Sequence, residues 1–358
     1  MSTFDAIPVL DLALLETDKP RLLRDLQHAL IHVGFFYVTG HRVPPAFLDN
    51  LARLTKGFFD LPLDLKLETD KIHSPTFLGY SVQGNEITKD KRDNREQFDF
   101  ANELPDTWES SQPLYERLSG PNLWPAEDKL PGFRHAVLEY VDRARELAEL
   151  LTRLVAESLG LPPNTLLENY VVPGQQHRGK LIKYPAVDQL RPIDGDQGVG
   201  PHRDTASLLT ILYQATAHPG LQVQNQQGQW IDAPPIPHTF VVNIGTGLEY
   251  LVRGAATATT HRVINPPAGT GPRYSIPFFL GARLDRALVP VDIPQDILLA
   301  KDTCVVTDSG HQFSDLYKVS PGRYYLLNRI SSHRDVGLKY YPELAAEHGI
   351  TAGENSGY

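Results

Sequence analysis

The sequence predicts a mainly β fold with flanking helices (α+β), in which a double-stranded β-helix (jelly-roll) core follows N-terminal helices. Two observations lead to this prediction. Apolar residues recur at helical spacings of three and four through much of the first 170 residues. From residue 180 onward the pattern changes to short apolar runs separated by turns rich in Gly, Pro and Asp, which is typical of many short strands.

The N-terminal part is predicted to contain two short strands and four helices. They are the strands 7–12 and 34–38 and the helices 19–33, 45–59, 131–159 and 164–170. The longest helix ends at Gly160, a residue type that commonly terminates helices. Residues 70–130 are rich in polar residues, Gly and Pro, and we interpret them as long loops with short strands, of the kind that often cover an active site.

The C-terminal part is predicted to supply the strands of the core. The candidates are 180–184, 206–213, 221–223, 239–244, 261–264, 274–280 and 288–291. Helix and loop are expected after about residue 294. We therefore interpret residues 1–358 as a single domain with three regions. These are an N-terminal region (1–130), the jelly-roll core (175–285) and a C-terminal strand with helices (286–358).

Composition excludes several classes of protein. The formal net charge is −9, and positive charges are scattered rather than clustered, which argues against a nucleic-acid partner. The sequence contains one cysteine, Cys304, so an internal disulfide is excluded. No secretory signal and no run of roughly 18 apolar residues is visible. These features predict a soluble, cytoplasmic protein that acts without a membrane; they leave its oligomeric state open.

Three polar side chains form a candidate metal site. His202 and Asp204 are two residues apart, so on an extended strand both side chains project to the same side. His261 lies far downstream, and a later antiparallel strand would have to bring it back to them. Two imidazoles and one carboxylate leave further coordination positions open, the arrangement used by non-haem Fe(II) enzymes.

Three motifs surround these candidate ligands: PHRDTASLLTILYQ (201–214), TTHRVINPP (259–267) and PRYSIPFF (272–279). They resemble the isopenicillin-N-synthase-like group of Fe(II)/2-oxoglutarate-dependent oxygenases, and fungal members most of all. Further segments that resemble this group are IPVLDL (7–12), GFFYVTGHRV (34–43), REQFDF (95–100), NLWP (122–125), GLQVQNQQGQWIDAPP (220–235) and VVNIG (241–245). The resemblance therefore extends over most of the chain.

The resemblance implies a set of cofactors and residues that bind them. The three candidate ligands would hold Fe(II), with 2-oxoglutarate as co-substrate and O2 as oxidant. Arg273 would bind the far carboxylate of 2-oxoglutarate through its planar guanidinium, and Ser275 would donate a further hydrogen bond. Tyr184 matches a tyrosine whose hydroxyl completes this pocket, although a packed strand aromatic is an equal alternative. Thr246 stands where the group commonly has Asp, and we expect this difference to change the local loop geometry.

The function implied is the oxidation of a small organic molecule by hydroxylation, desaturation or oxidative cyclisation, with release of succinate and CO2. The resemblance to fungal members points to specialised (secondary) metabolism. One alternative is a 2-oxoglutarate-independent Fe(II) oxidase of the same fold, in which Arg273 and Ser275 bind the carboxylate of the substrate. Another is a ligand-binding jelly roll without metal, against which the intact His–Asp–His set argues.

The remaining polar features receive simpler interpretations. A second His-Arg-Asp sequence at 333–335 is interpreted as a surface segment, because no later set of ligands accompanies it. The charged run 86–96 is interpreted as a solvated loop. Lys180 and Lys183 are expected to be solvated, with an acidic group of the substrate as the alternative partner. Substrate contacts are expected from the loops 77–80 and 95–100 and from Phe279.

Overall fold

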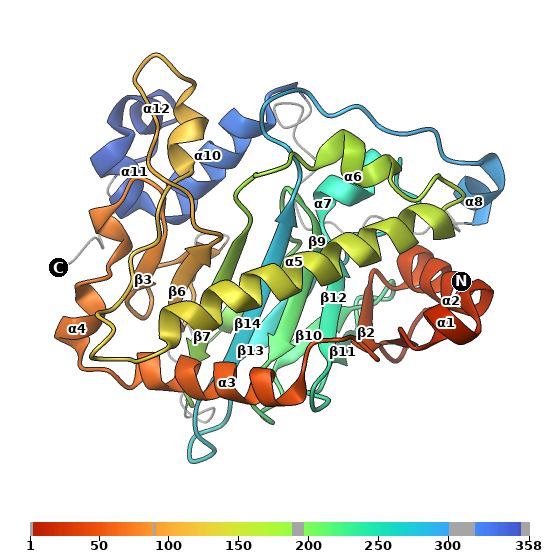
Figure 1. Cartoon of the computed structure of the whole chain (residues 1–358), viewed down its shortest axis with the longest axis horizontal. Coiled ribbons are helices and arrows are strands. Elements are labelled where there is room, and N and C mark those ends of the chain that lie inside the picture. The colour runs from red at the N-terminus through yellow and green to blue at the C-terminus, as the bar shows by residue number, and fades with distance from the viewer. Residues whose placement is uncertain (1–2, 89–90, 188–196, 301–318, 352–358) are drawn as a thin grey trace.

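The computed structural model describes residues 3–88, 91–187, 197–300 and 319–351 (Figure 1). The helices are α1 (Leu14–Thr17), α2 (Lys19–His32), α3 (Pro45–Phe59), α4 (Leu63–Leu67), α5 (Phe133–Ser158), α6 (Thr165–Tyr170), α7 (Thr246–Leu251), α8 (Gln295–Ala300), α10 (Pro321–Ser332), α11 (Arg334–Tyr340) and α12 (Pro342–Glu347), with short 3₁₀ turns η1 (Lys71–His73) and η2 (Leu114–Leu118). Among the described residues, no helix has both the length and the apolar character that crossing a bilayer requires.

Two facing sheets form the core of the molecule. The strands are β1 (Val9–Asp11), β2 (Phe35–Thr39), β3 (Gly79–Ser81), β4 (Ile87–Thr88), β5 (Lys91–Arg92), β6 (Glu96–Ala101), β7 (Arg178–Tyr184), β8 (Gln197–His202), β9 (Ser207–Gln214), β10 (Leu221–Gln224), β11 (Trp230–Asp232), β12 (Phe240–Ile244), β13 (His261–Ile264) and β14 (Arg273–Gly281). The larger sheet has the order β1-β2-β12-β9-β14-β7-β6-β3, and the smaller one β11-β10-β13-β8. The predicted jelly-roll core with N-terminal helices is therefore confirmed.

Alternation along the strands explains why the larger sheet is covered on both faces. Successive side chains of a strand point to opposite faces, so β2 places Phe36 and Val38 on one face and Phe35 and Tyr37 on the other. The first pair packs in the main core, against the buried sides of α2, α3 and α5. The second pair belongs to a smaller core that also takes residues from β8, β10 and β13, and so fills the space between the sheets. Figure 1 shows α5 lying across the outer face of the larger sheet.

The C-terminal helices form a third, separate cluster. Leu326, Leu327 and Ile330 of α10 pack with Phe77 and Leu118 from the N-terminal region. Figure 1 shows α10, α11 and α12 grouped beside β3 and β6, at one end of the larger sheet. Residues between 72 and 118 therefore meet the C-terminal helices at this end of the core.

Most predicted elements agree with the structure, and the exceptions have physical causes. The predicted strand 288–291 is wrong: these residues form no strand, and the backbone N–H of Val291 donates instead to the carbonyl of Leu251 in α7. The sequence analysis missed β8, whose sequence QGVGPH contains Gly and Pro, and β11, which has only three residues. Cys304 lies outside the described residues.

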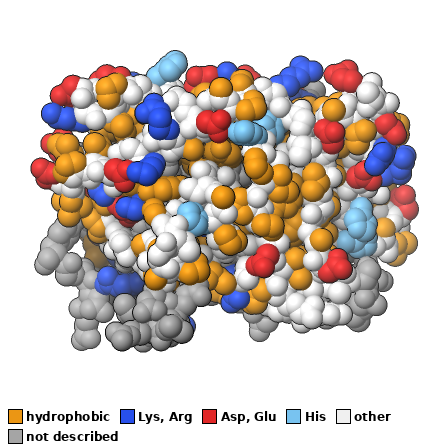
Figure 2. Space-filling view, turned by 90° about the horizontal axis from the view of Figure 1, so that it is seen from below, with side chains coloured by type: hydrophobic (Ala, Val, Ile, Leu, Met, Phe, Trp, Pro, Cys, Tyr) orange, Lys and Arg blue, Asp and Glu red, His pale blue; other side chains and the backbone are white. Residues whose placement is uncertain are grey.

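Charged side chains are mixed on the surface that Figure 2 presents. Lys and Arg do not gather into a single patch on this face, and Asp and Glu lie among them. Apolar side chains lie between the charged ones.

Gly34 positions the segment that leads to His261. It joins α2 to β2 with φ +74°, a conformation that L side chains rarely adopt. A Cβ here would overlap the carbonyl oxygen of Thr257 and the hydroxyl of Thr259. These two residues are tied to the end of α2, because the Thr257 N–H donates to the Leu30 carbonyl (2.9 Å) and the Thr259 hydroxyl donates to the Val33 carbonyl (2.6 Å).

We predict that Gly34→Ala destabilises the protein and weakens metal binding. The left-handed conformation alone costs about 1–2 kcal/mol with a side chain, and overlap with Thr257 and Thr259 adds about 1–3 kcal/mol. Gly174→Ala is the matched control, because Gly174 has φ +79° and nothing within 4 Å of an added Cβ. Urea denaturation of both variants measures the difference, and equal losses of stability would contradict the close approach at Gly34.

Candidate metal and co-substrate site

Register between two strands brings the three candidate ligands together. His202 is the last residue of β8, His261 is the first of β13, and the antiparallel pairing sets them directly opposite each other. Their ring centroids are 4.2 Å apart. The Oδ1 atom of Asp204 lies 3.6 Å from the Nε2 atom of each histidine. One ligand atom from each residue lies within 4.8 Å of the others, which is close enough to hold a single metal ion.

Backbone carbonyls orient both imidazoles. The Nδ1 atom of His202 lies 2.8 Å from the carbonyl of Gly200, and that of His261 lies 3.1 Å from the carbonyl of Thr259. A carbonyl oxygen only accepts, so Nδ1 carries a proton and the neutral ring leaves Nε2 free to bind a metal. Burial lowers the pKa of His261 to about 4, so this ring is neutral at pH 7.

Two side chains that the sequence analysis did not single out orient Asp204. Its Oδ2 atom accepts hydrogen bonds from the hydroxyl of Thr210 (2.5 Å) and from the amide of Asn243 (2.8 Å), while Oδ1 faces the histidines. Burial alone would raise the pKa of Asp204, but His261, His202 and Asn243 hold it well below its ordinary value. Thr210 interrupts the apolar run of β9 between Leu209 and Ile211, and Asn243 is a polar residue in the otherwise apolar strand β12; this was the signal available in the sequence.

Thr246 supports the turn that carries Asp204. Its backbone N–H donates to the carbonyl of Asp204 (2.8 Å), and its hydroxyl accepts from the N–H of Ala206 (3.3 Å). Ala206 has φ +66°, a strained conformation for a residue other than glycine. A threonine at this position therefore holds the turn through a neutral hydroxyl, where the related group commonly has a carboxylate.

Arg273 has donors that no described residue uses. Its side chain is 1% exposed, and one terminal nitrogen donates to Gln214 (3.0 Å), but Nε and the other terminal nitrogen have no hydrogen-bond partner among the described residues. Burial lowers the pKa of Arg273, because a charged group is poorly solvated there, and the neighbouring Tyr184 opposes this only in part. Unused donors on a buried cation are costly, so this side chain suits an anion that enters the site.

Ser275 and Tyr184 lie beside this guanidinium. Ser275 follows Arg273 by two residues on β14 and is 2% exposed. Tyr184 of β7 pairs with Arg273 across the sheet, and the Arg273 Cζ atom lies 5.1 Å from the centre of its ring. Both interpretations of Tyr184 therefore remain open, since it packs on the strand and also faces the same cavity.

One cavity of about 540 Å³ joins all six predicted site residues. Its inner wall is partly apolar, with Phe35, Ile182, Leu212 and Val263 from both sheets. Its opposite wall is built from charged and polar residues of the N-terminal region, of β7 and of α10. The cavity thus has room beside the metal ligands for a co-substrate and a second small molecule.

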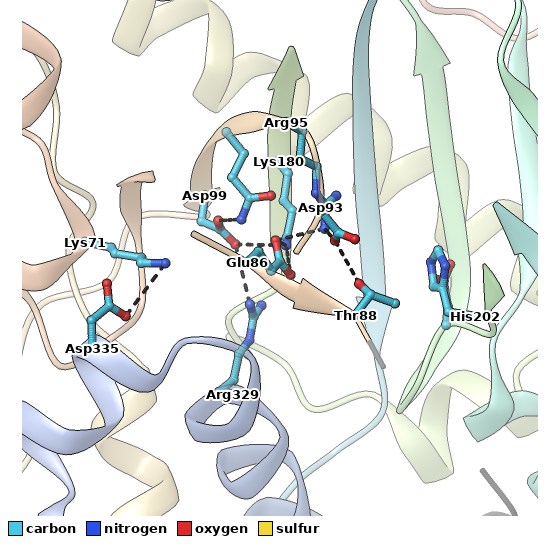
Figure 3. Close-up of polar contacts among 12 residues, drawn as sticks. Lys71, Glu86, Thr88, Asp93, Arg95, Asp99, Lys180, His202, Arg329 and Asp335 are labelled. Carbon is cyan, nitrogen blue, oxygen red and sulfur yellow. Dashed lines mark hydrogen bonds and ion pairs between the residues drawn. The ribbon is translucent and has the colours of Figure 1, made fainter. Parts of the chain in front are cut away.

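The charged run 86–96 is solvated only in part: Lys91 and Arg92 are exposed, residues 89 and 90 lie outside the described part of the chain, and the charged side chains at 86, 93, 95 and 96 are largely buried. Glu86 forms ion pairs with Arg95 (2.9 Å) and Lys180 (3.0 Å), and Asp93, which pairs with Arg95 (3.0 Å), is fully buried. Lys180 is likewise buried rather than solvated. Opposite charges from adjoining segments neutralise one another here, which allows the run to line the cavity (Figure 3). Lys183 is three-quarters buried and pairs with Glu96 (2.7 Å).

The second His-Arg-Asp sequence is not a surface segment either. His333 is fully buried between α10 and α11, and its ring meets that of Phe77 edge-on. Asp335 accepts a hydrogen bond from Asn85 (2.9 Å) and lies 3.9 Å from Lys71. Neither His333 nor Asp335 joins a group of possible metal ligands in the described part of the chain.

The expected substrate contacts are only partly correct. Arg95 and Phe279 line the cavity, but Phe77 and Tyr80 are buried in the cores and do not. The segment expected as a loop at 95–100 is mostly the strand β6. Successive side chains of β6 point alternately into the cores and toward the charged residues beside the cavity, because β6 is paired with β3 and β7.

Comparison with known proteins agrees with this geometry. Residues 7–127 match the family model of the N-terminal domain of the non-haem dioxygenase in morphine synthesis, and residues 165–282 match that of the 2OG-Fe(II) oxygenase superfamily. The chain is 41% identical to the 2-oxoglutarate-dependent dioxygenase frbJ of Dothideomycetidae sp. (strain 11243), over 96% of this chain and 95% of that one. It is 34% identical to the homoarginine-6-hydroxylase 2-ODD-C23 of Glycine max, over 81% and 89% of the two chains.

A solved structure shows the same architecture. A full-length protein of Neurospora crassa, crystallised in complex with alpha-KG (2-oxoglutarate), superposes with a TM-score of 0.73 at 27% identity, covering 93% of this chain and 96% of that one. A further structure of the same protein contains thymine as well. With its jelly-roll core, its His–Asp–His cluster and these relatives, the chain belongs to the isopenicillin-N-synthase-like group of Fe(II)/2-oxoglutarate-dependent dioxygenases, which use Fe(II), 2-oxoglutarate and O2.

Proposed function

We propose that this enzyme hydroxylates a small organic molecule at the metal end of the cavity. His202, Asp204 and His261 would hold Fe(II), and Arg273, Ser275 and Tyr184 would hold 2-oxoglutarate. The observation that carries the assignment is the juxtaposition, in one cavity, of an open-sided ligand set and a buried guanidinium with unused donors. When bound, these groups supply the oxidising chemistry, and 2-oxoglutarate leaves as succinate and CO2.

The residues of the chain would bind the co-substrate, orient the metal ligands and exclude water from the site. The planar guanidinium of Arg273 matches a carboxylate through two parallel hydrogen bonds, and Ser275 adds a third donor. Thr210 and Asn243 would fix the direction in which Asp204 offers its oxygen. The apolar wall around Phe35 and Val263 would keep bulk water from the reacting groups.

Hydroxylation is favoured over desaturation or cyclisation because the relative from Glycine max is named a hydroxylase. A role in cytoplasmic specialised metabolism is supported by the resemblance of the sequence motifs to those of fungal members. Succinate formation that depends on 2-oxoglutarate, followed by mass analysis of a substrate panel for a gain of one oxygen atom, tests the reaction.

Replacement of the carboxylate ligand should abolish iron binding. We expect Asp204→Ala to lose both Fe(II) binding in equilibrium dialysis and turnover, because two imidazoles alone hold the ion poorly. Asn243→Leu keeps all three ligands but frees Asp204 to rotate, and it should weaken Fe(II) binding by about 10–100-fold. Asp292→Ala, whose side chain is 97% exposed, serves as the control. Normal Fe(II) binding by Asp204→Ala would remove this cluster from the mechanism.

Replacement of the guanidinium should separate the two roles proposed for Arg273. We expect Arg273→Met to raise the KM for 2-oxoglutarate by at least about 100-fold, since breaking a buried charge pair costs about 3–5 kcal/mol. Arg42→Met, at an exposed position, should leave it unchanged. Turnover of the unaltered enzyme without 2-oxoglutarate, together with a raised KM of Arg273→Met for the other substrate, would instead indicate an oxidase that binds its substrate carboxylate through Arg273.

A further inference from the structure

The wall of the cavity formed by α10 has an unusual distribution of side chains. Tyr325, Asn328, Arg329 and Ser332 recur at helical spacing and all line the cavity. The apolar residues of the same helix face the other way, into the third cluster. A helix that only covered a core would turn its polar side toward solvent, so this polar stripe is suited to contact a polar molecule inside the protein.

The charges behind this stripe do not balance. A connected group of buried ionisable residues, which we call the charged wall, lines or supports the cavity (Figure 3). Ion pairs join its cations Arg95, Lys180 and Arg329 to its carboxylates Glu86, Asp93 and Asp99. Arg178 is buried in the same lining and forms no ion pair with a carboxylate among the described residues. One positive charge therefore has no opposite charge within the charged wall. Burial raises the pKa of Asp93, and its protonation would only increase the positive excess.

Arg178 and Arg329 differ in how firmly they are held. Arg178 donates from one terminal nitrogen to the carbonyl of Thr76 (2.8 Å) and from the other to that of Leu118 (2.6 Å), so its position is fixed by backbone. One terminal nitrogen of Arg329 lies 3.5 Å from the Asp99 carboxylate, and the other donates to the Tyr325 hydroxyl at 3.2 Å. A guanidinium carries five N–H donors, so Arg329 has capacity to bind a further acceptor.

Two further side chains near Arg329, Tyr325 and His333, support a role of this wall in binding an anion. Burial by itself would raise the pKa of the Tyr325 hydroxyl, but the guanidinium groups of Arg329 and Arg178 hold this pKa below its ordinary value. His333 lines the cavity and is fully buried, and neither ring nitrogen has a hydrogen-bond partner among the described residues. Burial and Lys71 hold the pKa of His333 well below its ordinary value, so the ring is neutral and offers one N–H donor.

We propose that the primary substrate carries a carboxylate and that Arg329 binds it, with a hydrogen bond from His333, at the α10 wall of the cavity. This proposal rests on the proposed function and names its substrate class. Arg273 is assigned to 2-oxoglutarate, so 2-oxoglutarate and the substrate carboxylate would bind at different walls of one cavity. The planar guanidinium of Arg329 matches the two oxygens of a carboxylate through parallel hydrogen bonds.

Matched acids and amides test the proposal on the unaltered chain. The probes are hexanoate with hexanamide, phenylacetate with phenylacetamide, and N-acetyl-L-leucine with its primary amide; phenyl phosphate is the dianionic probe. Each is titrated into the anaerobic complex with Fe(II) and 2-oxoglutarate, and binding is followed by changes in its weak visible charge-transfer band. We expect each acid to bind at least about tenfold more tightly than its amide, as a charge-assisted hydrogen bond provides.

Two substitutions on α10 locate the effect. Arg329→Gln should remove the preference for acids over amides, and Arg329→Lys should restore part of it. Arg323→Gln is the matched control, since Arg323 lies on the same helix but is 40% exposed and pairs with Glu347. The comparison of acids with amides needs no variant, so it decides the question even if Arg329→Gln does not fold.

The outcomes separate this proposal from the proposed function. Equal binding of acids and amides, no binding of any acid, tighter binding of phenyl phosphate than of phenylacetate, or an equal effect of Arg323→Gln would each overturn the carboxylate site. If the visible band never forms on adding Fe(II) and 2-oxoglutarate, the proposed function fails and the carboxylate site fails with it. A band that forms without any preference for acids overturns the carboxylate site alone.

Discussion

The pairing of β8 with β13 is the constraint on which the site depends. It sets His202 opposite His261, and the turn after β8 then brings Asp204 to the same point. Side chains alternate along a strand, so a shift of register by one residue would turn one imidazole to the other face of the sheet. Contacts elsewhere in the molecule stabilise that register. The smaller core holds the two sheets together, and Gly34 ties the segment before β13 to the end of α2.

Buried charge is the second organising feature, and it is concentrated on one side of the cavity. Burial removes the solvation that stabilises a charge, and pairing with an opposite charge offsets that cost for most of these residues. Glu86 and Asp99 each meet two cations, so few side chains neutralise several charges at once. Such a network is rigid and is poorly suited to a purely apolar molecule. It therefore makes the cavity selective without involving the metal ligands.

The sequence predicted the parts of this protein that depend on local pattern. Helical spacing identified α2, α3 and α5, and short apolar runs between turns identified β9, β12, β13 and β14. The predicted metal ligands and the residues expected to hold 2-oxoglutarate do meet in one cavity. That prediction was possible because the two-residue spacing of His202 and Asp204 and the resemblance of the motifs each point to particular residues.

What the sequence did not predict depends on contacts between distant segments. The charged run 86–96 has the composition of a solvated loop, and pairing with distant lysines makes burial of its two ends favourable: Glu86 pairs with Lys180, and Glu96 with Lys66 and Lys183. His333 has the same neighbours in sequence as His202, yet it is buried by Phe77, which lies far away in the chain. β8 escaped detection because its Gly and Pro residues resemble a turn, although its partner β13 holds it as a strand.

The two-sided nature of α10 has a consequence for how such enzymes diversify. One side of the helix stabilises the C-terminal cluster, and the other side faces the reaction chamber. Residues on the inner side can therefore be exchanged during evolution while the outer side continues to anchor the helix. A lineage could acquire new metabolites as substrates through a handful of mutations near its carboxyl terminus, and the oxidising centre would be inherited unaltered.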